Sequence, residues 1–390
     1  MQTLHLKPAK HQRIRQGHLW AFAGEISEKL SEIEPGDLVV LREAKGRKLG
    51  IGYVNPHSLI AVRLLTRDDE EWDEGLIRQR IRSAFADRKR IMADYEAYRL
   101  IYSESDGLPG LIVDNYNGHL VLQSLTAGME RLLDQVVQAL KDEFPVKSIF
   151  FRGSSPFRTL EKLPEEDKVL LGEPPDEVIF KSDGIKLTAR IKAGQKSGFF
   201  LDQSSNRRLL NGITEGKSVL DLFSYTGAWG LNALSYGAKK AVMVDTSQNA
   251  LDWGSEDAKL NGFSGRCLFV KADAGEFLED LNNTSRKFDV VVLDPPSLIP
   301  NRSSIAKGYA AYKAINTAAM RAVETGGYLV SCSCSYHLSR ADHLTLLGEA
   351  VQKSGRRCRI VKSGGHAPDH PVLPGHPETE YLKCQVLLCE

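Results

Sequence analysis

In the second half of the chain, short apolar runs alternate with segments of helix length, and this alternation constrains the fold more than any other feature. The apolar runs cover residues 219–223, 241–245, 267–271, 290–293 and 328–334. Gly237 and Gly262 stand where the intervening helices are expected to end. Apolar strands that alternate with helices in this way predict an α/β fold built on a doubly wound parallel sheet.

Polar residues follow several of these predicted strands, at the edge where parallel strands bring their carboxyl ends together. Asp221 and Gly227 belong to the turn after the first strand, Asp245 ends the second, and Asp273 follows the third. A dinucleotide site would need Gly-x-Gly-x-x-Gly, and this turn offers only Gly227 and Gly230. No Lys-Ser/Thr pair for a triphosphate follows the turn.

A ligand without phosphate fits this pattern better, and we expect S-adenosylmethionine (SAM). Asp221 and Gly227 would serve its methionine part. Asp245 would bind the ribose hydroxyls, and Asp273 would bind the adenine. A buried aspartate at a strand end can equally be a structural cap, so each of these residues also has a structural interpretation.

Further candidate residues lie just before the first strand and around the turns that follow the strands. Phe199 and Phe200 precede Asp202 and Gln203, and the sequence leaves open whether the two aromatic rings line the ligand pocket or pack in the core. The predicted cofactor-binding residues are Phe199, Asp202, Gln203, Asp221, Phe223, Tyr225, Gly227, Asp245, Ser247, Asp273, Ala274, Asp294 and Pro295.

The run Asp294-Pro295-Pro296 follows the fourth strand, where active-site loops of such sheets belong. Two prolines stiffen the loop, because each fixes its own φ and the first restricts the residue before it. A stiff loop could hold Asp294 and nearby carbonyl groups against a flat base. Methyltransferases that act on exocyclic amines usually carry an aromatic residue after Pro-Pro. Ser297 takes that place here and counts against amine chemistry.

Cys332 and Cys334 on the last apolar run indicate the class of reaction. Carbon 5 of a pyrimidine accepts a methyl group only after a thiolate adds to carbon 6, which makes the ring carbon enolate-like. Positions i and i+2 of a strand share a face, so both sulfurs could point toward the loop of Asp294. The alternative is a pair of buried structural thiols.

The first half of the chain predicts two smaller domains. Residues 1–71 contain short strands, and Pro35-Gly36-Asp37 before an apolar strand and a later Gly50-x-Gly52-Tyr53 resemble a PUA domain, a small RNA-binding β-barrel. Residues 72–185 begin with a helix and continue as a central α+β domain. The methyltransferase domain would then occupy residues 186–390.

Composition limits the partners and the compartment. The 390 residues carry a formal net charge of +1, but residues 1–24 contain Lys7, Lys10, Arg13 and Arg15 and no acid. A second basic cluster, Arg78 to Arg90, is interpreted as a solvated helix face or as a phosphate contact. Six cysteines without regular spacing predict neither a disulfide framework nor a metal site. With no apolar run of about 18 residues, we expect no membrane partner and a cytoplasmic location.

Together these motifs resemble the RlmI-type family of ribosomal RNA large-subunit 5-methylcytosine methyltransferases. The resemblance runs from the PUA-like start through Glu104–Asp114, residues 197–203, residues 221–227 and Asp294-Pro295-Pro296 to residues 331–335. It implies large-subunit ribosomal RNA as the partner, and it implies that Cys334, in Ser333-Cys334-Ser335, attacks carbon 6. Asp294 is the second candidate catalytic residue.

Three points stay open at the level of sequence. Related enzymes often carry a second cysteine where this chain has Ser297, so the base that removes the carbon-5 proton is unassigned, with Asp294 and Cys332 as candidates. An enzyme of the same fold could instead methylate a guanine ring nitrogen without cysteine catalysis. An RNA-binding protein with a decayed methylase is disfavoured because Asp221, Asp245, Asp273 and Asp294 are all in place. A homodimer is among the expected partners, although the sequence does not determine the oligomeric state.

Overall fold

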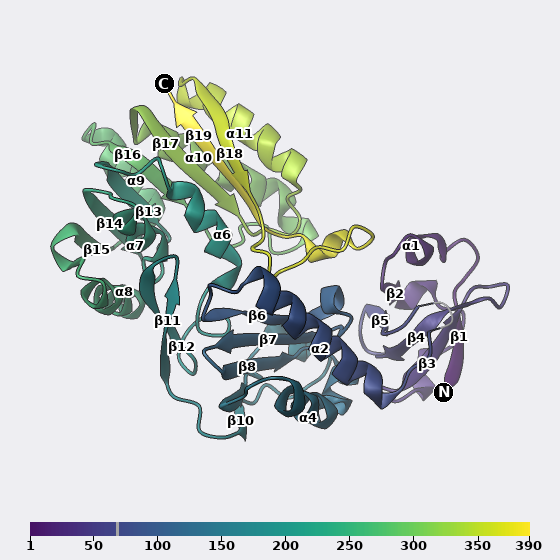
Figure 1. The fold of residues 1–390 in the computed structure, drawn as a ribbon. Helices are drawn as coiled ribbons and strands as arrows, with labels where there is room; N and C mark the ends of the chain where they lie inside the picture. The colour runs from purple at the N-terminus through teal and green to yellow at the C-terminus, as the bar shows by residue number, and fades with distance from the viewer. Residues whose placement is uncertain (68–69) are drawn as a thin grey trace. The chain divides into compact units, whose positions relative to one another are not determined.

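The computed structural model describes residues 1–67 and 70–390, and these form two compact units. The first unit contains Met1–Phe180, Ala189–Leu201 and Pro368–Thr379, and the second contains Lys181–Thr188, Asp202–Ala367 and Glu380–Glu390. Each unit therefore combines stretches that are far apart in the sequence, as the colours of Figure 1 show. The division into domains 1–71, 72–185 and 186–390 stays a prediction.

The N-terminal part of the first unit is a five-stranded sheet with the strand order β1-β3-β4-β5-β2. Its strands are β1 (Gln2–His5), β2 (Trp20–Phe22), β3 (Leu38–Arg42), β4 (Lys48–Val54) and β5 (Ile60–Leu64), and the short helix α1 spans Gln12–Arg15. β3 alternates buried and half-buried side chains, so Val39 and Leu41 enter the core. A Cβ at Gly52 would stand 2.3 Å from the carbonyl oxygen of Arg63, which explains the glycine in Gly50-x-Gly52.

The rest of the first unit is a second five-stranded sheet with helices against it, in the order β10-β9-β8-β7-β6. The strands are β6 (Ala97–Tyr102), β7 (Leu111–Tyr116), β8 (His119–Ser124), β9 (Ser148–Phe151) and β10 (Lys168–Leu171). The helices are α2 (Glu74–Ile91), α3 (Ala127–Arg131), α4 (Leu133–Glu143) and α5 (Pro156–Leu160). α2 begins where the Asp73 carboxylate accepts a hydrogen bond from the Leu76 amide. The apolar sides of α2 and α4 close the core over this sheet.

The basic cluster on α2 is tied to acidic partners. Arg78 and Arg82 both donate to Glu143 on α4. Arg88 is buried, with its guanidinium bonded to both carboxylate oxygens of Asp106 at 2.7 Å and to the carbonyl oxygen of Asp369 at 3.0 Å. This part of the cluster therefore stabilises the first unit, and Arg88 does not lie on a solvated face.

Replacing Arg88 with methionine should destabilise the protein strongly. The substitution leaves the buried Asp106 carboxylate without its cation, and such a loss typically costs about 3 kcal/mol of the free energy of unfolding. Urea unfolding measures the difference. Arg90→Ala is the matched control, because Arg90 and Asp87 form an exposed pair that should contribute less than about 0.5 kcal/mol. Equal effects of the two substitutions would contradict this assignment.

The second unit is built on a seven-stranded sheet with the order β15-β14-β13-β16-β17-β19-β18, as expected for a doubly wound α/β fold. Its strands are β13 (Ser218–Leu222), β14 (Lys240–Asp245), β15 (Cys267–Lys271), β16 (Phe288–Leu293), β17 (Val323–Ser333), β18 (Cys358–Gly364) and β19 (Lys383–Cys389). The first five strands are parallel, and β19 pairs antiparallel with both β17 and β18. β11 (Glu177–Ser182) and β12 (Ile185–Arg190) form a two-stranded sheet before it.

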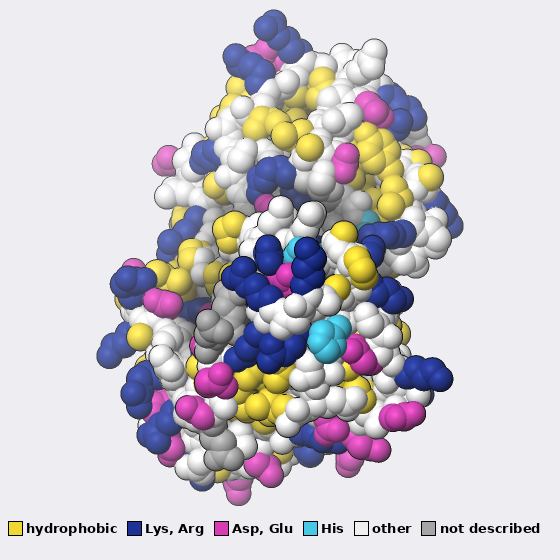
Figure 2. All heavy atoms as spheres, turned by 90° about the vertical axis from the view of Figure 1, so that its right-hand side faces the viewer, with side chains coloured by type: hydrophobic (Ala, Val, Ile, Leu, Met, Phe, Trp, Pro, Cys, Tyr) yellow, Lys and Arg dark blue, Asp and Glu magenta, His cyan; other side chains and the backbone are white. Residues whose placement is uncertain are grey.

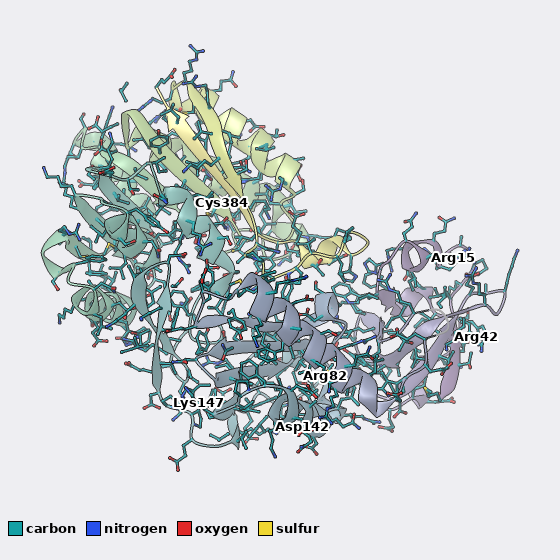
Figure 3. The ribbon with its side chains drawn as sticks, in the orientation of Figure 1. Arg15, Arg42, Arg82, Asp142, Lys147 and Cys384 are labelled. Atoms are coloured by element: carbon teal, nitrogen blue, oxygen red, sulfur yellow. The ribbon has the colours of Figure 1, made fainter. Side chains whose placement is uncertain are left out.

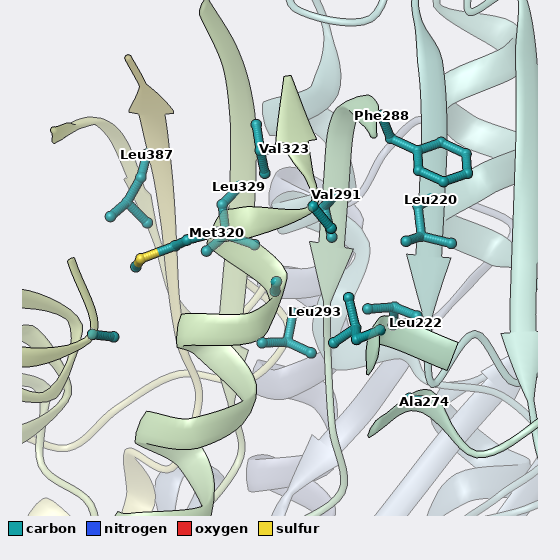
Figure 4. Close-up of a cluster of buried hydrophobic side chains, with 14 of the residues drawn as sticks. Leu220, Leu222, Ala274, Phe288, Val291, Leu293, Met320, Val323, Leu329 and Leu387 are labelled. Atoms are coloured by element: carbon teal, nitrogen blue, oxygen red, sulfur yellow. The ribbon is translucent and has the colours of Figure 1, made fainter. Parts of the chain in front are cut away.

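Helices follow the strands of this sheet and bury its apolar faces. They are α7 (Ala228–Ser235), α8 (Gln248–Leu260), α9 (Ala274–Asn283), α10 (Ile305–Arg321) and α11 (Arg340–Ser354), and a further helix, α6 (Ser204–Arg207), precedes β13. Figure 4 shows Leu222, Leu293 and Met320 among the fully buried side chains of one such layer. β17 ends at Ser333, one residue before Cys334, so Cys334 belongs to the loop after the strand.

Among residues 1–67 and 70–390, no helix combines the length and the apolar character that crossing a membrane requires.

Candidate active site

The loop between β13 and α7 holds an unusual backbone. Phe223 and Tyr225 have φ values of +58° and +50°, and Gly227 has +76°. For residues other than glycine this left-handed conformation costs about 1 kcal/mol or more, so strain is stored where the sequence predicted a ligand. At Gly227 a side chain would be strained by the positive φ and crowded as well, because a Cβ would lie 3.0 Å from Cγ of Met243.

Asp221, at the end of β13, is fully buried and incompletely bonded. Its Oδ2 accepts a hydrogen bond of 3.0 Å from the Gly230 amide. Its Oδ1, together with the hydroxyls of Ser224 and Thr226, has no partner within the described part of the chain. Burial, followed by the nearby carboxylates of Asp294 and Asp245, raises the pKa of Asp221 to about 8.

These observations test whether the loop fits SAM. The methionine part of SAM carries an ammonium group, and a cation beside Asp221 would offset the burial of its carboxylate. The buried hydroxyls of Ser224 and Thr226 offer further partners for a polar ligand. The strained turn and these three partnerless oxygens therefore fit the methionine part of the predicted cofactor.

Asp245 and Ser247 shape the next turn. The Asp245 carboxylate accepts hydrogen bonds from the Tyr225 amide at 2.8 Å and from the Ser247 amide at 2.9 Å. The Ser247 hydroxyl caps α8 by accepting from the Ala250 amide. Asp245 thus holds the strained loop and the start of α8 together, and its half-exposed carboxylate retains lone pairs for ribose hydroxyls.

Asp273 is the N-cap of α9. Its Oδ1 accepts from the amides of Gly275 at 2.8 Å and Glu276 at 3.1 Å, while Ala274 is the buried first residue of the helix. Asp273 is therefore a helix cap, which is the structural interpretation that the sequence left open for this residue. The adenine contacts of Asp273 and Ala274 stay a prediction.

Asp294 is held by two side chains from other elements. The Gln203 amide group donates to both carboxylate oxygens at 2.9 Å, and the Trp229 indole N–H donates to Oδ2 at 3.0 Å. Gln203 is oriented in turn by Asn206, which donates to its Oε1 at 2.6 Å. The sequence did not single out Trp229 or Asn206. The signal for Trp229 was its place in the first turn of α7, since a buried indole N–H needs a partner.

Asp202 and Phe199 lie in different units. Asp202 belongs to the second unit, where its Oδ2 accepts a hydrogen bond of 2.6 Å from the Tyr381 hydroxyl. Phe199 belongs to the first unit, where its buried ring meets Phe180 edge to face at 5.1 Å. Phe199 thus packs in the core of its own unit, and its contact with the cofactor stays a prediction.

The two cysteines near β17 have different surroundings. Cys334 is half-buried, and its Sγ lies 3.8 Å from the carbonyl oxygen of Pro295 in the loop after β16. Cys332 is fully buried and pairs in register with Cys384 of β19, which Figure 3 labels. Burial and the Cys384 thiol raise the pKa of Cys332 well above its usual range. Only Cys334 combines access with a place beside the Asp294-Pro295-Pro296 loop.

A hydroxyl network joins the loop of Cys334 to the loop of Asp294. The Ser335 hydroxyl lies 2.9 Å from the Ser297 hydroxyl and 2.8 Å from that of Tyr312, and it accepts from the Ile299 amide at 3.1 Å. Ser297 occupies the position at which amine methyltransferases carry an aromatic residue, and here its hydroxyl joins the two loops through Ser335. These hydrogen bonds of Ser335 join the loop that carries Cys334 to the loop that carries Pro295.

A separate cluster in the first unit brings together His18, His376 and Glu378, with ligand atoms that lie within 4.8 Å of one another. Backbone amides donate to Nδ1 of both rings, so each neutral ring carries its proton on Nε2. Burial lowers the pKa of both histidines, to about 4 for His376. Nε2 of His18 lies 3.0 Å from Oε2 of Glu378, whereas Nε2 of His376 lies 4.0 Å from it and has no hydrogen-bond partner among the described residues.

Comparison with known families and structures agrees with this arrangement. A PUA-like domain model matches residues 4–67, and the family described as conserved hypothetical protein 95 matches residues 204–327. A candidate SAM-dependent methyltransferase from Streptococcus mutans superposes with a TM-score of 0.85 at 18% identity over 100% of both chains. A candidate methyltransferase complexed with S-adenosylhomocysteine superposes equally well, with a TM-score of 0.85. The fold is that of a Rossmann-like SAM methyltransferase preceded by a PUA-like domain.

Relatives with similarity over the full length identify the family. Ribosomal RNA large subunit methyltransferase I of Alteromonas mediterranea is 36% identical over 389 residues, covering 99% of this chain and 98% of that protein. The protein of the same name from Vibrio cholerae is 35% identical over 394 residues, covering 99% of both. The chain belongs to the ribosomal RNA large subunit methyltransferase I family. The predicted family and fold class are thereby confirmed, and the predicted cofactor, SAM, agrees with these relatives and structures.

Replacing Asp221 with asparagine should change how stability depends on pH. In the unfolded chain this carboxyl ionises near pH 4, whereas the folded protein keeps its proton up to about pH 8. The unfolded state therefore binds fewer protons between these values, and the wild type should lose up to about 1.4 kcal/mol per pH unit relative to Asp221→Asn. Urea unfolding of the SAM-free proteins between pH 5 and 8 measures this difference.

Asp289→Asn is the control for this experiment. Although burial opposes it, hydrogen bonds from Ser218 lower the pKa of Asp289, so its carboxyl is ionised in both states above pH 5. That variant should shift stability by a constant amount between pH 5 and 8. Parallel curves for the wild type and Asp221→Asn would show that Asp221 is ionised in the folded protein.

Proposed function

We propose that this protein uses SAM to methylate carbon 5 of a cytosine in large-subunit ribosomal RNA, through a covalent adduct with Cys334. One observation carries the proposal: the thiol of half-buried Cys334 lies 3.8 Å from the Pro295 carbonyl, at the carboxyl end of β16. In doubly wound sheets ligands bind at this edge, so the thiol lies where a base beside the methyl donor would lie. The relatives named as large-subunit ribosomal RNA methyltransferases support the choice of RNA.

The residues of the chain account for each step of such a reaction. The Cys334 thiolate attacks carbon 6 of the cytosine, and the electrons of the 5,6 double bond move toward carbon 5. Bound SAM supplies the methyl group as an electrophilic sulfonium. Loss of the proton on carbon 5 then restores the double bond, and the carbon–sulfur bond breaks with its electrons returning to Cys334.

Asp294 is the better of the two candidates for removing that proton. Its carboxylate accepts hydrogen bonds from the neutral groups of Gln203 and Trp229, which orient it without supplying a cation. Cys332 is fully buried, and the raised pKa of its thiol keeps it protonated. A base must reach its proton within hydrogen-bond distance, and the buried thiol of Cys332 does not meet this requirement.

The cofactor roles follow the order of the strands. Asp221, with the turn of Phe223, Tyr225 and Gly227, would bind the methionine part of SAM, and Asp245 would bind the ribose hydroxyls. Exposed Asp273 and the adjoining Ala274 would contact the adenine. Gln203 and Pro295 contribute by positioning Asp294 and the loop that follows it.

The N-terminal sheet would bind RNA phosphates. On the face drawn in Figure 2, dark blue Lys and Arg side chains gather in several groups among acidic ones. Lys7 and Lys10 are exposed, and Arg15 is exposed although it pairs with Glu43. Figure 3 places Arg15 and Arg42 on this N-terminal part. Such contacts give affinity without base specificity. A cytoplasmic location and a homodimer stay predictions.

Cys334→Ala should abolish methyl transfer from SAM to large-subunit ribosomal RNA that lacks its modifications, while SAM binding persists. Cys332→Ala is the matched control, because it removes a neighbouring thiol that does not reach the substrate. Labelled SAM measures transfer, and nucleoside mass spectrometry identifies the product. RNA with 5-fluorocytosine should also trap the adduct on the wild type and on Cys332→Ala, since fluorine at carbon 5 leaves no proton to remove.

Two outcomes would contradict the proposal. An active Cys334→Ala variant would exclude the thiol adduct. A methylated guanine as the product would favour the second candidate activity, methylation of a ring nitrogen without cysteine catalysis.

A further inference from the structure

Lys383 is a buried cation within the second unit that none of the steps above uses. It is the first residue of β19 and pairs in register with Ser333, the last residue of β17 and the neighbour of Cys334. Only 2% of its surface is exposed. A buried lysine is costly unless its charge is compensated, so its place needs an explanation.

The amino group of Lys383 is held from two sides. Nζ donates to the carbonyl oxygen of Ser335 at 2.6 Å and to that of Tyr381 at 2.7 Å. An ammonium group has three hydrogens, so these bonds leave one for another acceptor. The residue before Ser335 is Cys334, and the charges of Cys334 and Lys383 interact.

We propose that Lys383 is a positioning residue that holds a positive charge beside Cys334 and so favours its thiolate form. The inference rests on the proposed role of Cys334 as the nucleophile. A thiolate next to a fixed ammonium group forms at a lower pH than a free thiol does. The thiol proton leaves to solvent, because Cys334 is half-buried, and Lys383 keeps its own proton.

The same cation would act again at the end of the reaction. When the carbon–sulfur bond breaks, negative charge returns to the sulfur, and an ammonium group already in place stabilises it without rearrangement. The bonds to Ser335 and Tyr381 prevent the amine from turning away. Lys383 would therefore assist both attack and release without transferring a proton.

The charged and titratable groups around this pair set the pH range. Burial lowers the pKa of Lys383 to about 8, Cys334 and Glu380 oppose this, and Arg340 adds to it. His343 and Tyr312 also interact with the pair, from α11 and α10. Because Lys383 is protonated below about pH 8, its effect on Cys334 should be present at neutral pH and should fade above pH 8.

The test measures the reactivity of Cys334 directly, without RNA or SAM. The full-length protein is alkylated with iodoacetamide between pH 5 and 10, and peptide fragmentation separates Cys334 from Cys332. In Lys383→Gln and Lys383→Met, alkylation at pH 7 should slow by roughly tenfold, and the half-maximal rate should move up by about one pH unit. Lys383→Arg keeps the charge and should retain most of the rate.

Stabilisation of each variant by SAM in a thermal shift assay shows that the site has folded. A lysine with a purely structural role would alter stability and leave the alkylation profile unchanged, and that result would overturn the inference. The wild type gives a second test, because its Cys334 should react faster at pH 7 than free cysteine does. A slower rate would also overturn the inference. Neither readout depends on methylation, so an active Cys334→Ala variant would refute the proposed function separately.

Discussion

The parallel pairing of β13 with β14 on one side and β16 on the other decides where the candidate site lies. Asp221 pairs with Met243 and Val292 in this register, so the carboxyl ends of the three strands meet at one edge. Asp221, Asp245 and Asp294 converge there, and the crowding of negative charge with burial raises the pKa of Asp221. The site is thus electrostatically unfavourable until a cation joins it. Such a site is well suited to a cofactor that carries an ammonium and a sulfonium group.

Rigidity at this edge comes from bonds between loops. The Ser335 hydroxyl bonds to Ser297, Ile299 and Tyr312, so hydrogen bonds join the loop after β16 to the loop after β17. Lys383 adds a third element, since β19 reaches the carbonyl of Ser335. A side chain held by its neighbours in this way loses little entropy when a ligand binds, and this is how a fold contributes to orientation.

Several parts of this arrangement were predictable from local pattern. Strand and helix periodicity indicated the parallel sheet, and the residues at strand ends indicated its ligand edge. Prediction was incomplete for residues to which the local sequence allowed two different structural roles. The sequence allowed Asp273 to be a cap or an adenine contact; its bonds to Gly275 and Glu276 show that it is a cap, and they leave the adenine contact untested. Arg88 was expected in a basic run, and its bond with Asp106 depends on how α2 packs against the turn that follows β6.

The sequence by itself determined the fold class, the family and the order of the candidate residues, because apolar periodicity and short motifs are local properties of the chain. The family resemblance favoured Cys334 over Cys332, but only the tertiary structure gave the physical difference, which is the burial of Cys332 against β19, more than 40 residues away. Only the tertiary structure brought Trp229 and Gln203 to Asp294, and Lys383 to the loop of Cys334. The physical reason is that hydrogen bonds and charge interactions across strands depend on distance in space, which spacing along the chain does not encode.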